Sequence, residues 1–264
     1  MNFNSAKLVS YSKMYDDKAR ELSLIEQVAY CARVSNPANQ NNHETSEKLC
    51  DYLLRNHHYS PFEMVNICVE IETTRDISRQ IIRHRSFTFQ EFSQRYAEVH
   101  DFVLRECRFQ HPTNRQLSVG LTEYDEEQIE INDNFRELQQ ELMNKQVEYY
   151  EYCIANKIAK EQARCILSEG LTKTRLYMNG TLRSWIHYIK IRSDSSTTQK
   201  EHSDVCLKIV GEIEKVFPMI RKFVCQENES NNQIFKEVPD VTKVKEVAEE
   251  ETETYNRIVS CVIC

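Results

Sequence analysis

The 264-residue chain has only four glycines and five prolines, which limits the phosphate-binding motifs that it can carry. Glycine-rich phosphate loops need several closely spaced glycines, because only glycine lets the backbone approach the phosphate oxygens there. Neither the G-x-G-x-x-G pattern of dinucleotide-binding folds nor the G-x-x-x-x-G-K-[ST] pattern of P-loop proteins occurs in the sequence. Any phosphate site in this protein must therefore depend on side chains.

Long apolar runs are also missing. No stretch approaches the roughly 18 consecutive apolar residues that a membrane-spanning helix needs. The first 17 residues are polar and lack the apolar centre of a secretion signal. We therefore expect a soluble, cytoplasmic protein without a membrane partner.

Apart from Cys261 and Cys264, the ten cysteines are scattered singly rather than in closely spaced pairs, which argues against a disulfide framework. Most of them lie inside apolar patterns, which is typical of buried reduced thiols. The thiols predicted to be buried are Cys31, Cys68, Cys153, Cys165 and Cys206. A metal site is not expected either, because the side chains of the adjacent His57 and His58 point apart and no carboxylate-rich segment follows them.

The net charge of −7 argues against broad nucleic-acid binding, but this charge is distributed unevenly. Residues 226–264 contain nine acidic and four basic residues, so we expect an acidic C-terminal extension after a domain formed by residues 1–225. In contrast, residues 75–95 contain five arginines and two acidic residues. This local excess of positive charge predicts an anion site.

Hydrophobic periodicity predicts more helix than strand, and therefore an α+β fold. Val65, Ile67, Val69 and Ile71 alternate with polar residues or cysteine, which predicts a half-buried strand at 64–72. Helices are predicted at 22–34, 44–55 (with Asn42 as the cap), 74–83, 126–154, 160–167, 179–191 and 205–224.

The sharpest motif is Arg83-His84-Arg85, which is followed after seven residues by Ser93. The planar guanidinium group donates two parallel hydrogen bonds that suit phosphate oxygens. Neighbouring cationic side chains repel one another unless an anion lies between them. A solvated basic helix end, paired with Asp76 and Glu91, is the alternative interpretation.

A second basic cluster is predicted on one face of the 179–191 helix, where Arg183, His187 and Lys190 line up and Arg192 follows. The core face of this helix carries Leu182, Trp185, Ile186 and Ile189. A basic surface face is again the alternative. Neither a G-x-S-x-G elbow nor an evident Cys-His pair occurs, so the sequence offers anion-binding groups but no clear nucleophile. This combination suits an enzyme whose cofactor supplies the chemistry.

The Arg83-His84-Arg85 motif with Ser93 resembles the signature of the flavin-dependent thymidylate synthases. Three more segments resemble that family in the same order. They are Cys31-Ala32-Arg33-Val34-Ser35, His58-Tyr59-Ser60-Pro61-Phe62-Glu63, and Arg183-Ser184 through Ile191-Arg192 with Gln199 and Glu201. Together the four segments span most of residues 32–202. The fold implied by the resemblance has mixed helices and a small, mainly antiparallel sheet.

The resemblance implies reductive methylation of dUMP to dTMP, with methylenetetrahydrofolate as carbon donor and FAD, reduced by NADPH, as hydride source. It also implies a homotetramer whose active sites form where subunits meet. The implied FAD-binding residues are Ser35, Ser60, Arg83, His84, Arg85, Glu91, Thr181, Arg183 and His187. The implied dUMP-binding residues are Gln80, Arg83, Glu91, Ser93, Gln94, Arg95, Arg164 and Arg192.

Two of these residues carry the implied chemistry. Arg192 would stabilise the negative charge that develops on the uracil ring, and Ser93 would orient the substrate without attacking it. Arg95 and Arg164 would hold the phosphate. Two other interpretations remain: a non-catalytic nucleotide- or RNA-binding protein that uses the same arginines, and a flavoprotein of this fold without methyl transfer.

Overall fold

The computed structural model describes residues 3–16, 19–122 and 124–225. Its main sheet has four strands in the order β1-β4-β8-β5, and every neighbouring pair is antiparallel. These strands are β1 (Ser5–Tyr11), β4 (Asn66–Thr74), β5 (Phe87–Glu91) and β8 (Lys173–Thr181). Two short antiparallel pairs are β2 (Met14–Tyr15) with β3 (Glu21–Leu22), and β6 (Phe109–Gln110) with β7 (Ser118–Val119).

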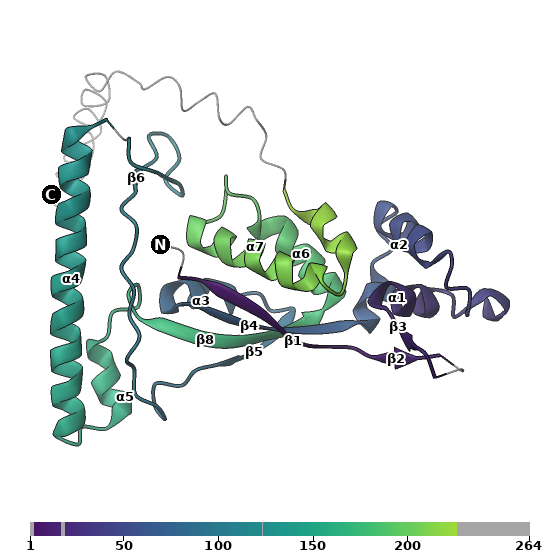
Figure 1. Cartoon of the computed structure of the whole chain (residues 1–264), viewed down its shortest axis with the longest axis horizontal. Coiled ribbons are helices and arrows are strands. Elements are labelled where there is room, and N and C mark those ends of the chain that lie inside the picture. The colour runs from purple at the N-terminus through teal and green to yellow at the C-terminus, as the bar shows by residue number, and fades with distance from the viewer. Residues whose placement is uncertain (1–2, 17–18, 123, 226–264) are drawn as a thin grey trace, which may run out of the picture. The chain divides into compact units, whose positions relative to one another are not determined.

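Helices α6 and α7 cover one face of this sheet, whereas α4 and α5 lie beyond one end of it and α1 and α2 beyond the other (Figure 1). The α-helices are α1 (Leu24–Ala32), α2 (Ser46–Arg55), α3 (Arg75–Ile81), α4 (Glu126–Ala155), α5 (Lys160–Ala163), α6 (Leu182–Arg192) and α7 (Lys200–Glu214). Short 3-10 helices are η1 (Pro37–Asn39), η2 (Ser60–Met64), η3 (Arg164–Ile166) and η4 (Pro218–Phe223). Helices and an antiparallel sheet confirm the predicted α+β fold.

The predicted strand at 64–72 is confirmed as β4, shifted by two residues. Val65 and the β4 residues Ile67, Val69 and Ile71 are fully buried, as the alternation predicts. These side chains all point to the face that α6 and α7 cover, because successive residues of a strand point to opposite faces.

The prediction of a helix from residue 179 is wrong at its start. Residues 173–181 form strand β8, and α6 begins only at Leu182. The strand forms because Leu176 and Met178 alternate with exposed positions and pair with β4 on one side and β5 on the other. Thr181 then ends the strand and caps α6, since its hydroxyl accepts a hydrogen bond from the backbone N–H of Ser184 at 3.3 Å.

Three other helix boundaries differ from the predictions. Helix α2 follows Thr45 rather than the predicted cap Asn42, whose carbonyl instead accepts a hydrogen bond from Arg33. The predicted 160–167 helix is short and continues as the 3-10 helix η3. Helix α7 starts at Lys200, before the predicted residue 205, and ends at Glu214 ahead of Pro218. Pro218 opens a separate 3-10 helix, because proline cannot donate the backbone hydrogen bond of a helix interior.

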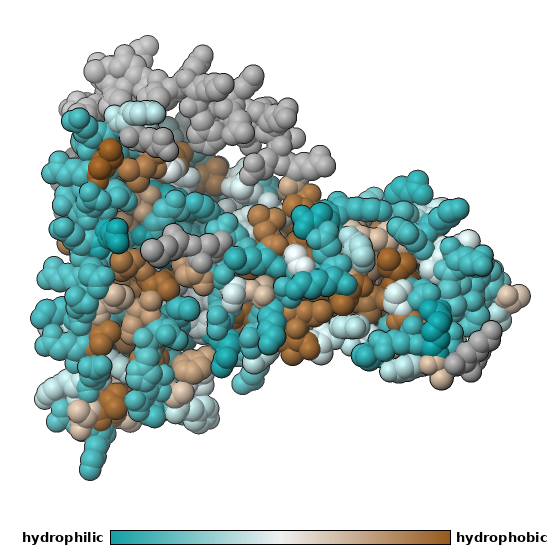
Figure 2. All heavy atoms as spheres, in the orientation of Figure 1, coloured by the Kyte–Doolittle hydropathy of each residue, from teal (hydrophilic) through white to brown (hydrophobic). Residues whose placement is uncertain are grey.

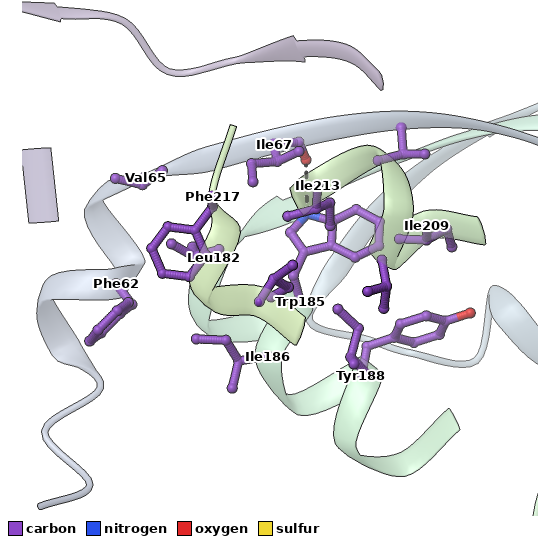
Figure 3. Close-up of a cluster of buried hydrophobic side chains, with 14 of the residues drawn as sticks. Phe62, Val65, Ile67, Leu182, Trp185, Ile186, Tyr188, Ile209, Ile213 and Phe217 are labelled. Carbon is purple, nitrogen blue, oxygen red and sulfur yellow. Dashed lines mark hydrogen bonds between the residues drawn. The ribbon is translucent and has the colours of Figure 1, made fainter. Parts of the chain in front are cut away.

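The main core lies between the sheet and α6 and α7, around Trp185 (Figure 3). The indole ring is fully buried and its N–H donates to the carbonyl of Ile67 at 3.1 Å. Burying roughly 200 Å² of aromatic surface contributes about 5 kcal/mol before entropy is counted. Leu182, Ile186 and Ile189 are buried beside it, so the predicted core face of this helix is confirmed.

Gly180 makes room for the Phe87 side chain on the neighbouring strand. The two residues are paired across β8 and β5. A Cβ atom on Gly180 would lie 2.4 Å from Cδ1 of Phe87, well inside van der Waals contact. With glycine there, the Phe87 ring packs edge-on against Trp185 at a centroid distance of 4.7 Å. The residue that starts the strand after the Arg-His-Arg motif is thus fixed against the core.

Arg105 holds the long, mostly irregular connection between β5 and α4 against the rest of the fold. Its guanidinium contacts the hydroxyl of Thr74 at 2.8 Å, the carboxylate of Asp76 at 3.2 Å and that of Glu201 at 3.2 Å. Its backbone exchanges two hydrogen bonds with the side-chain amide of Gln139 on α4. One residue therefore connects this segment to α3, α7 and α4.

All eight cysteines within the described residues are free thiols. Cys153 and Cys206 are buried as predicted, and Cys31 and Cys68 are partly buried. Cys165 is exposed, contrary to the prediction, because it lies in the 3-10 helix η3 rather than on the inner face of a longer helix. The predicted acidic extension 226–264 lies outside the described residues. No helix in the described part of the chain is both long and apolar enough to cross a membrane.

Candidate active site

The Arg-His-Arg motif forms the turn between α3 and β5. Arg83 and Arg85 are exposed, while His84 between them is partly buried. Within the described residues neither arginine has a hydrogen-bond or ion-pair partner. The alternative of a basic helix end paired with Asp76 and Glu91 therefore does not hold for these two arginines. Two free guanidinium groups on either side of His84 form a ready anion site.

His84 joins this turn to the end of α6. The Nε of Arg192 donates a hydrogen bond to the Nε2 of His84 at 3.0 Å, so this nitrogen must be the unprotonated acceptor. Burial, together with the charges of Arg192 and His187, lowers the pKa of His84 to about 4. His84 is therefore neutral at physiological pH. Within the described residues only the Nε of Arg192 has a hydrogen-bond partner, which leaves its terminal nitrogens for a ligand.

Gln80, one turn before the motif, is held by two residues of the α7 region. Its Nε2 donates to Gln199 at 2.7 Å, and its Oε1 lies 3.3 Å from the Nδ1 of His202. The Nε2 of His202 lies 3.1 Å from the hydroxyl of Tyr188. The roles of His202 and Tyr188 were missed at the sequence level. The available signal was spacing, because His202 shares an inward helical face with Cys206, Ile209 and Ile213.

Glu91 ends β5 and is surrounded by donors from α3 and β8. Its carboxylate accepts hydrogen bonds from Ser78 at 2.9 Å and Thr174 at 3.0 Å. The guanidinium groups of Arg75 and Arg79 lie 3.8 and 3.6 Å away. Arg75 and Arg79 are thus ion-paired within the chain, unlike Arg83. The Glu91 carboxylate is therefore held in place by side chains of α3 and β8.

Ser93, Gln94 and Arg95 lie in the turn after β5. Arg95 pairs with the carboxylate of Glu161 at 3.3 Å, and the Nε of Arg164 donates to the Glu161 carbonyl at 3.3 Å. Arg95 and Arg164 thus both contact Glu161 at α5, Arg95 through its carboxylate and Arg164 through its backbone. Gln94 is buried, and its Nε2 has no hydrogen-bond partner among the described residues. A buried amide without a partner is costly and is typical of a site that receives a ligand.

The basic face of α6 is confirmed, and it packs against η2. Arg183, His187 and Lys190 are all exposed. Arg183 forms an ion pair with Glu63, and Lys190 donates to the hydroxyl of Tyr59 at 3.1 Å. Ser60 is exposed between these two contacts. The motif at 58–63 and the motif at 183–192 are therefore neighbours in the structure.

Ser35 lies apart from these residues, after α1. It lines a cavity of about 470 Å³ together with Arg33, Asn36 and Lys48. Arg33 is buried and shapes the cavity wall, because it donates to the Thr45 hydroxyl at 2.8 Å. A larger hollow of about 730 Å³ lies between α4 and the segment around His100, and none of the predicted site residues line it.

One chain thus brings the predicted residues together in groups. Gln80, His84 and Arg192 form one group, and Arg183 and His187 lie on α6 beside Ser60 in η2. Arg95 and Arg164 form another group at α5, which Figure 1 draws beyond the end of the sheet and away from α6. Among the described residues there is no cluster of three or more His, Cys, Asp or Glu side chains that could hold a metal ion.

Comparison with known proteins gives a consistent result. The family model described as thymidylate synthase complementing protein matches residues 19–219. A Synechocystis sp. flavin-dependent thymidylate synthase is 45% identical over 193 residues, which cover 73% of this chain and 86% of that protein. A Paramecium bursaria Chlorella virus 1 protein named "Probable flavin-dependent thymidylate synthase" is 41% identical over 219 residues, 83% of this chain and 97% of its own length.

A solved structure has the same fold at lower identity. The UMP/dUMP methylase PolB from Streptomyces cacaoi, bound with 5-Br dUMP, superposes with a TM-score of 0.70 at 23% identity. The match covers 84% of this chain and 95% of PolB. At this identity the likeness concerns the fold, and the assignment rests on the family model and the two relatives. The chain belongs to the thymidylate synthase complementing protein family, the family of the flavin-dependent thymidylate synthases.

Proposed function

We propose that this protein catalyses the reductive methylation of dUMP to dTMP, with methylenetetrahydrofolate as carbon donor and with FAD, reduced by NADPH, as hydride source. The activity is assigned to residues 1–225 and to the cytoplasm. The membership of the family supports the reaction, and the names of two relatives support the use of flavin and the formation of thymidylate. The residues that would carry it are those of the candidate active site.

The observation that carries this proposal is the unpaired state of Arg83 and Arg85 around the neutral His84, which accepts a hydrogen bond from the cationic Arg192. Two other exposed arginines, Arg20 and Arg221, form ion pairs with glutamates. Arg83 and Arg85 stand two residues apart without such a carboxylate, so positive charge accumulates at this turn. Anionic ligands such as a nucleotide phosphate or a flavin pyrophosphate would neutralise that charge.

The donor set of the site fits FAD. The exposed hydroxyl of Ser60, the exposed Arg183 and the exposed His187 lie along α6 and η2, next to Arg85 in the turn before β5. These groups offer several donors to a pyrophosphate and to flavin carbonyls. The hydroxyl of Thr181 accepts the capping hydrogen bond of α6 and also lies 3.1 Å from the hydroxyl of Ser184. The residues that would hold FAD are Ser35, Ser60, Arg83, His84, Arg85, Glu91, Thr181, Arg183 and His187.

The nucleotide would be held by residues of the Arg192 group and the Arg95 group together. Arg95 and Arg164 would bind the phosphate, Gln80 and Gln94 would donate from buried or half-buried amides, and Ser93 would orient the ring. FAD, when bound in its reduced form, supplies the hydride for the reaction. The terminal nitrogens of Arg192 would stabilise the negative charge that develops on the pyrimidine, which is the role of a preorganised donor. Ser93 needs no proton acceptor, because it does not attack.

We also propose that copies of this chain assemble into a homotetramer whose active sites lie between subunits. The separation of the Arg95 and Arg192 groups within one chain supports shared sites. Helix α4 offers a surface for assembly, because exposed apolar residues recur on it at spacings of three, four or seven residues. These residues are Ile131, Phe135, Leu138, Leu142, Tyr149 and Tyr152. Figure 2 shows apolar patches along this helix.

The experiment that tests the proposed function uses the purified full-length chain. The protein should turn yellow with FAD and bleach on anaerobic addition of NADPH. It should then convert dUMP to dTMP when methylenetetrahydrofolate is supplied, as followed by chromatography of the nucleotides. A colourless protein that takes up no FAD would exclude the reaction, and a yellow protein that bleaches but forms no dTMP would mark a flavoprotein without methyl transfer.

A further inference from the structure

A continuous chain of hydrogen bonds runs behind the candidate nucleotide site. It links the side chains of Tyr188, His202, Gln80, Gln199 and Glu201, and we call it the His202 relay. Its contacts measure 3.1 Å from Tyr188 to His202, 3.3 Å from His202 to Gln80, 2.7 Å from Gln80 to Gln199 and 2.9 Å from Gln199 to Glu201. Tyr188 and His202 are fully buried, and Glu201 is nearly so.

Glu201 fixes one end of the relay as a pure acceptor. Burial alone would raise the pKa of Glu201, but the hydrogen bond from Arg108 and the charge of Arg105 outweigh it and hold this pKa below its usual value. An ionised carboxylate only accepts hydrogen bonds, so Gln199 must turn its Nε2 towards Glu201. The Oε1 of Gln199 then faces Gln80 and accepts from the Gln80 Nε2.

The same reasoning applies to the rest of the relay, from Gln80 to Tyr188. Because its Nε2 faces Gln199, Gln80 turns its Oε1 towards His202, and the Nδ1 of His202 must carry the proton. The Nε2 of His202 is then an acceptor for the hydroxyl of Tyr188. Burial raises the pKa of Tyr188 well above its usual value, so the phenol remains a donor. Burial, with Arg192 and His84, also lowers the pKa of His202 to about 3, which keeps the ring neutral.

We propose that His202 is a positioning residue that fixes the orientation of the Gln80 amide, so that Gln80 keeps one free N–H for an oxygen of the bound nucleotide. This inference rests on the proposed function, because it takes Gln80 as a dUMP ligand. Without a donor at His202, the Gln80 amide keeps its contact with Gln199 but loses the second of the two contacts that distinguish its oxygen from its nitrogen. A reversed amide would present an oxygen where phosphate or uracil oxygens need a donor.

Two substitutions at His202 separate this role from simple packing. His202→Asn keeps a donor where the Nδ1 stood, because the asparagine Nδ2 has the same place along the side chain. His202→Gln keeps a polar partner for Tyr188 but places nothing at the Nδ1 position. We expect His202→Asn to keep the KM for dUMP close to the original value. His202→Gln should raise this KM about fivefold, as for one lost neutral hydrogen bond, with kcat little changed.

The control is the same pair of substitutions at His100, an exposed histidine outside the relay, where neither should change KM. Equal effects of Asn and Gln at position 202 would overturn the inference. So would a fivefold effect of His202→Gln that persists in a Gln80→Leu background, because the loss would then not pass through Gln80.

A measurement on the unsubstituted protein tests the relay without relying on turnover or on the folding of a variant. In protein labelled with ¹⁵N-histidine, the His202 ring should show the Nδ1–H tautomer, with Nε2 unprotonated. An Nε2–H tautomer would overturn the inference even if the enzyme is active. If the protein forms no dTMP while the Nδ1–H tautomer is present, the proposed function fails and the relay stands as a structural finding.

Discussion

Arg192 makes one structural contact, and the remainder of its guanidinium group carries the proposed catalytic role. Its Nε is used by His84, while its terminal nitrogens have no partner among the described residues. We expect Arg192→Ala to lower kcat for dTMP formation by about 100- to 1000-fold, because removing one preorganised donor from a developing negative charge has effects of this size. FAD binding, followed by fluorescence quenching, should remain. Arg221→Ala, which removes an exposed surface pair, is the control, and unchanged turnover in Arg192→Ala would refute the assigned role.

The two buried histidines make the stability of the fold sensitive to mild acid. The pKa values of His84 and His202 are lowered to about 4 and about 3, whereas the same residues in the unfolded chain titrate near 6.5. Below pH 6.5 the unfolded chain binds protons that the folded chain does not, so the free energy of unfolding falls as the pH decreases. A tenfold difference in proton affinity corresponds to about 1.4 kcal/mol.

Urea unfolding at pH 7 and pH 5 measures this effect, since most carboxylates stay ionised over that range. His202→Asn should show a smaller loss of stability between the two pH values than the unsubstituted protein. His100→Asn should keep the full loss, because that histidine is exposed. If the free energy of unfolding falls equally between pH 7 and pH 5 in all three proteins, then the fold does not hold His202 neutral.

At the scale of single residues, the motifs predicted which side chains come together better than how each one is held. The grouping of His84 with Arg192 and of Arg95 with Arg164 involves residues chosen from the motifs. His202 was missed because the predicted helix began only at residue 205, so the face that His202 shares with Cys206 and Ile209 was not considered. Its burial arises from the packing of α7 on α3 and α6, which is a tertiary effect.

At the scale of elements, only β4 of the four strands of the main sheet was predicted, and part of β8 was assigned to the helix at 179–191. A strand pattern and a helix pattern both allow apolar residues at Leu176, Met178 and Leu182, and a short apolar run does not distinguish the two. Residues 173–181 form a strand because β8 has a strand on each side, and its backbone N–H and C=O groups pair with those strands. Long, strongly periodic elements such as β4 and α4 were predicted well.

Gly180 offers a test of how tightly these elements fit. We expect Gly180→Ala to destabilise the protein by about 1 to 3 kcal/mol, since the new methyl group displaces the Phe87 ring from Trp185. Gly211→Ala in α7 is the matched control, because nothing lies within 4 Å of the added atom and alanine favours a helix. Urea unfolding of both variants measures the difference. Equal stability of the two would show that Phe87 can move without cost.

At the scale of the whole molecule, the apolar stripe on α4 should control assembly. Leu138 is 65% exposed in the single chain. A glutamate there would bury an unpaired charge in the proposed subunit interface, which is strongly unfavourable. We expect Leu138→Glu to release smaller species in light scattering, and to lose activity with them because the proposed active sites lie between subunits. Gln140→Glu, which adds the same charge on another side of the helix, should remain tetrameric, whereas an intact tetramer in Leu138→Glu would exclude this surface.

The contacts that Arg105 makes with Thr74, Asp76 and Glu201 have a consequence for the resistance of the chain to proteases. The segment between β5 and α4 has little regular structure, and its attachment depends on the same Glu201 carboxylate that anchors the His202 relay. Detachment of this segment removes both Arg105 and Arg108 from Glu201, and so weakens the hold of the relay on Gln80. By thermodynamic linkage, a nucleotide bound at Gln80 opposes that detachment. Trypsin should therefore cleave this segment more slowly when a nucleotide is bound than in the free protein.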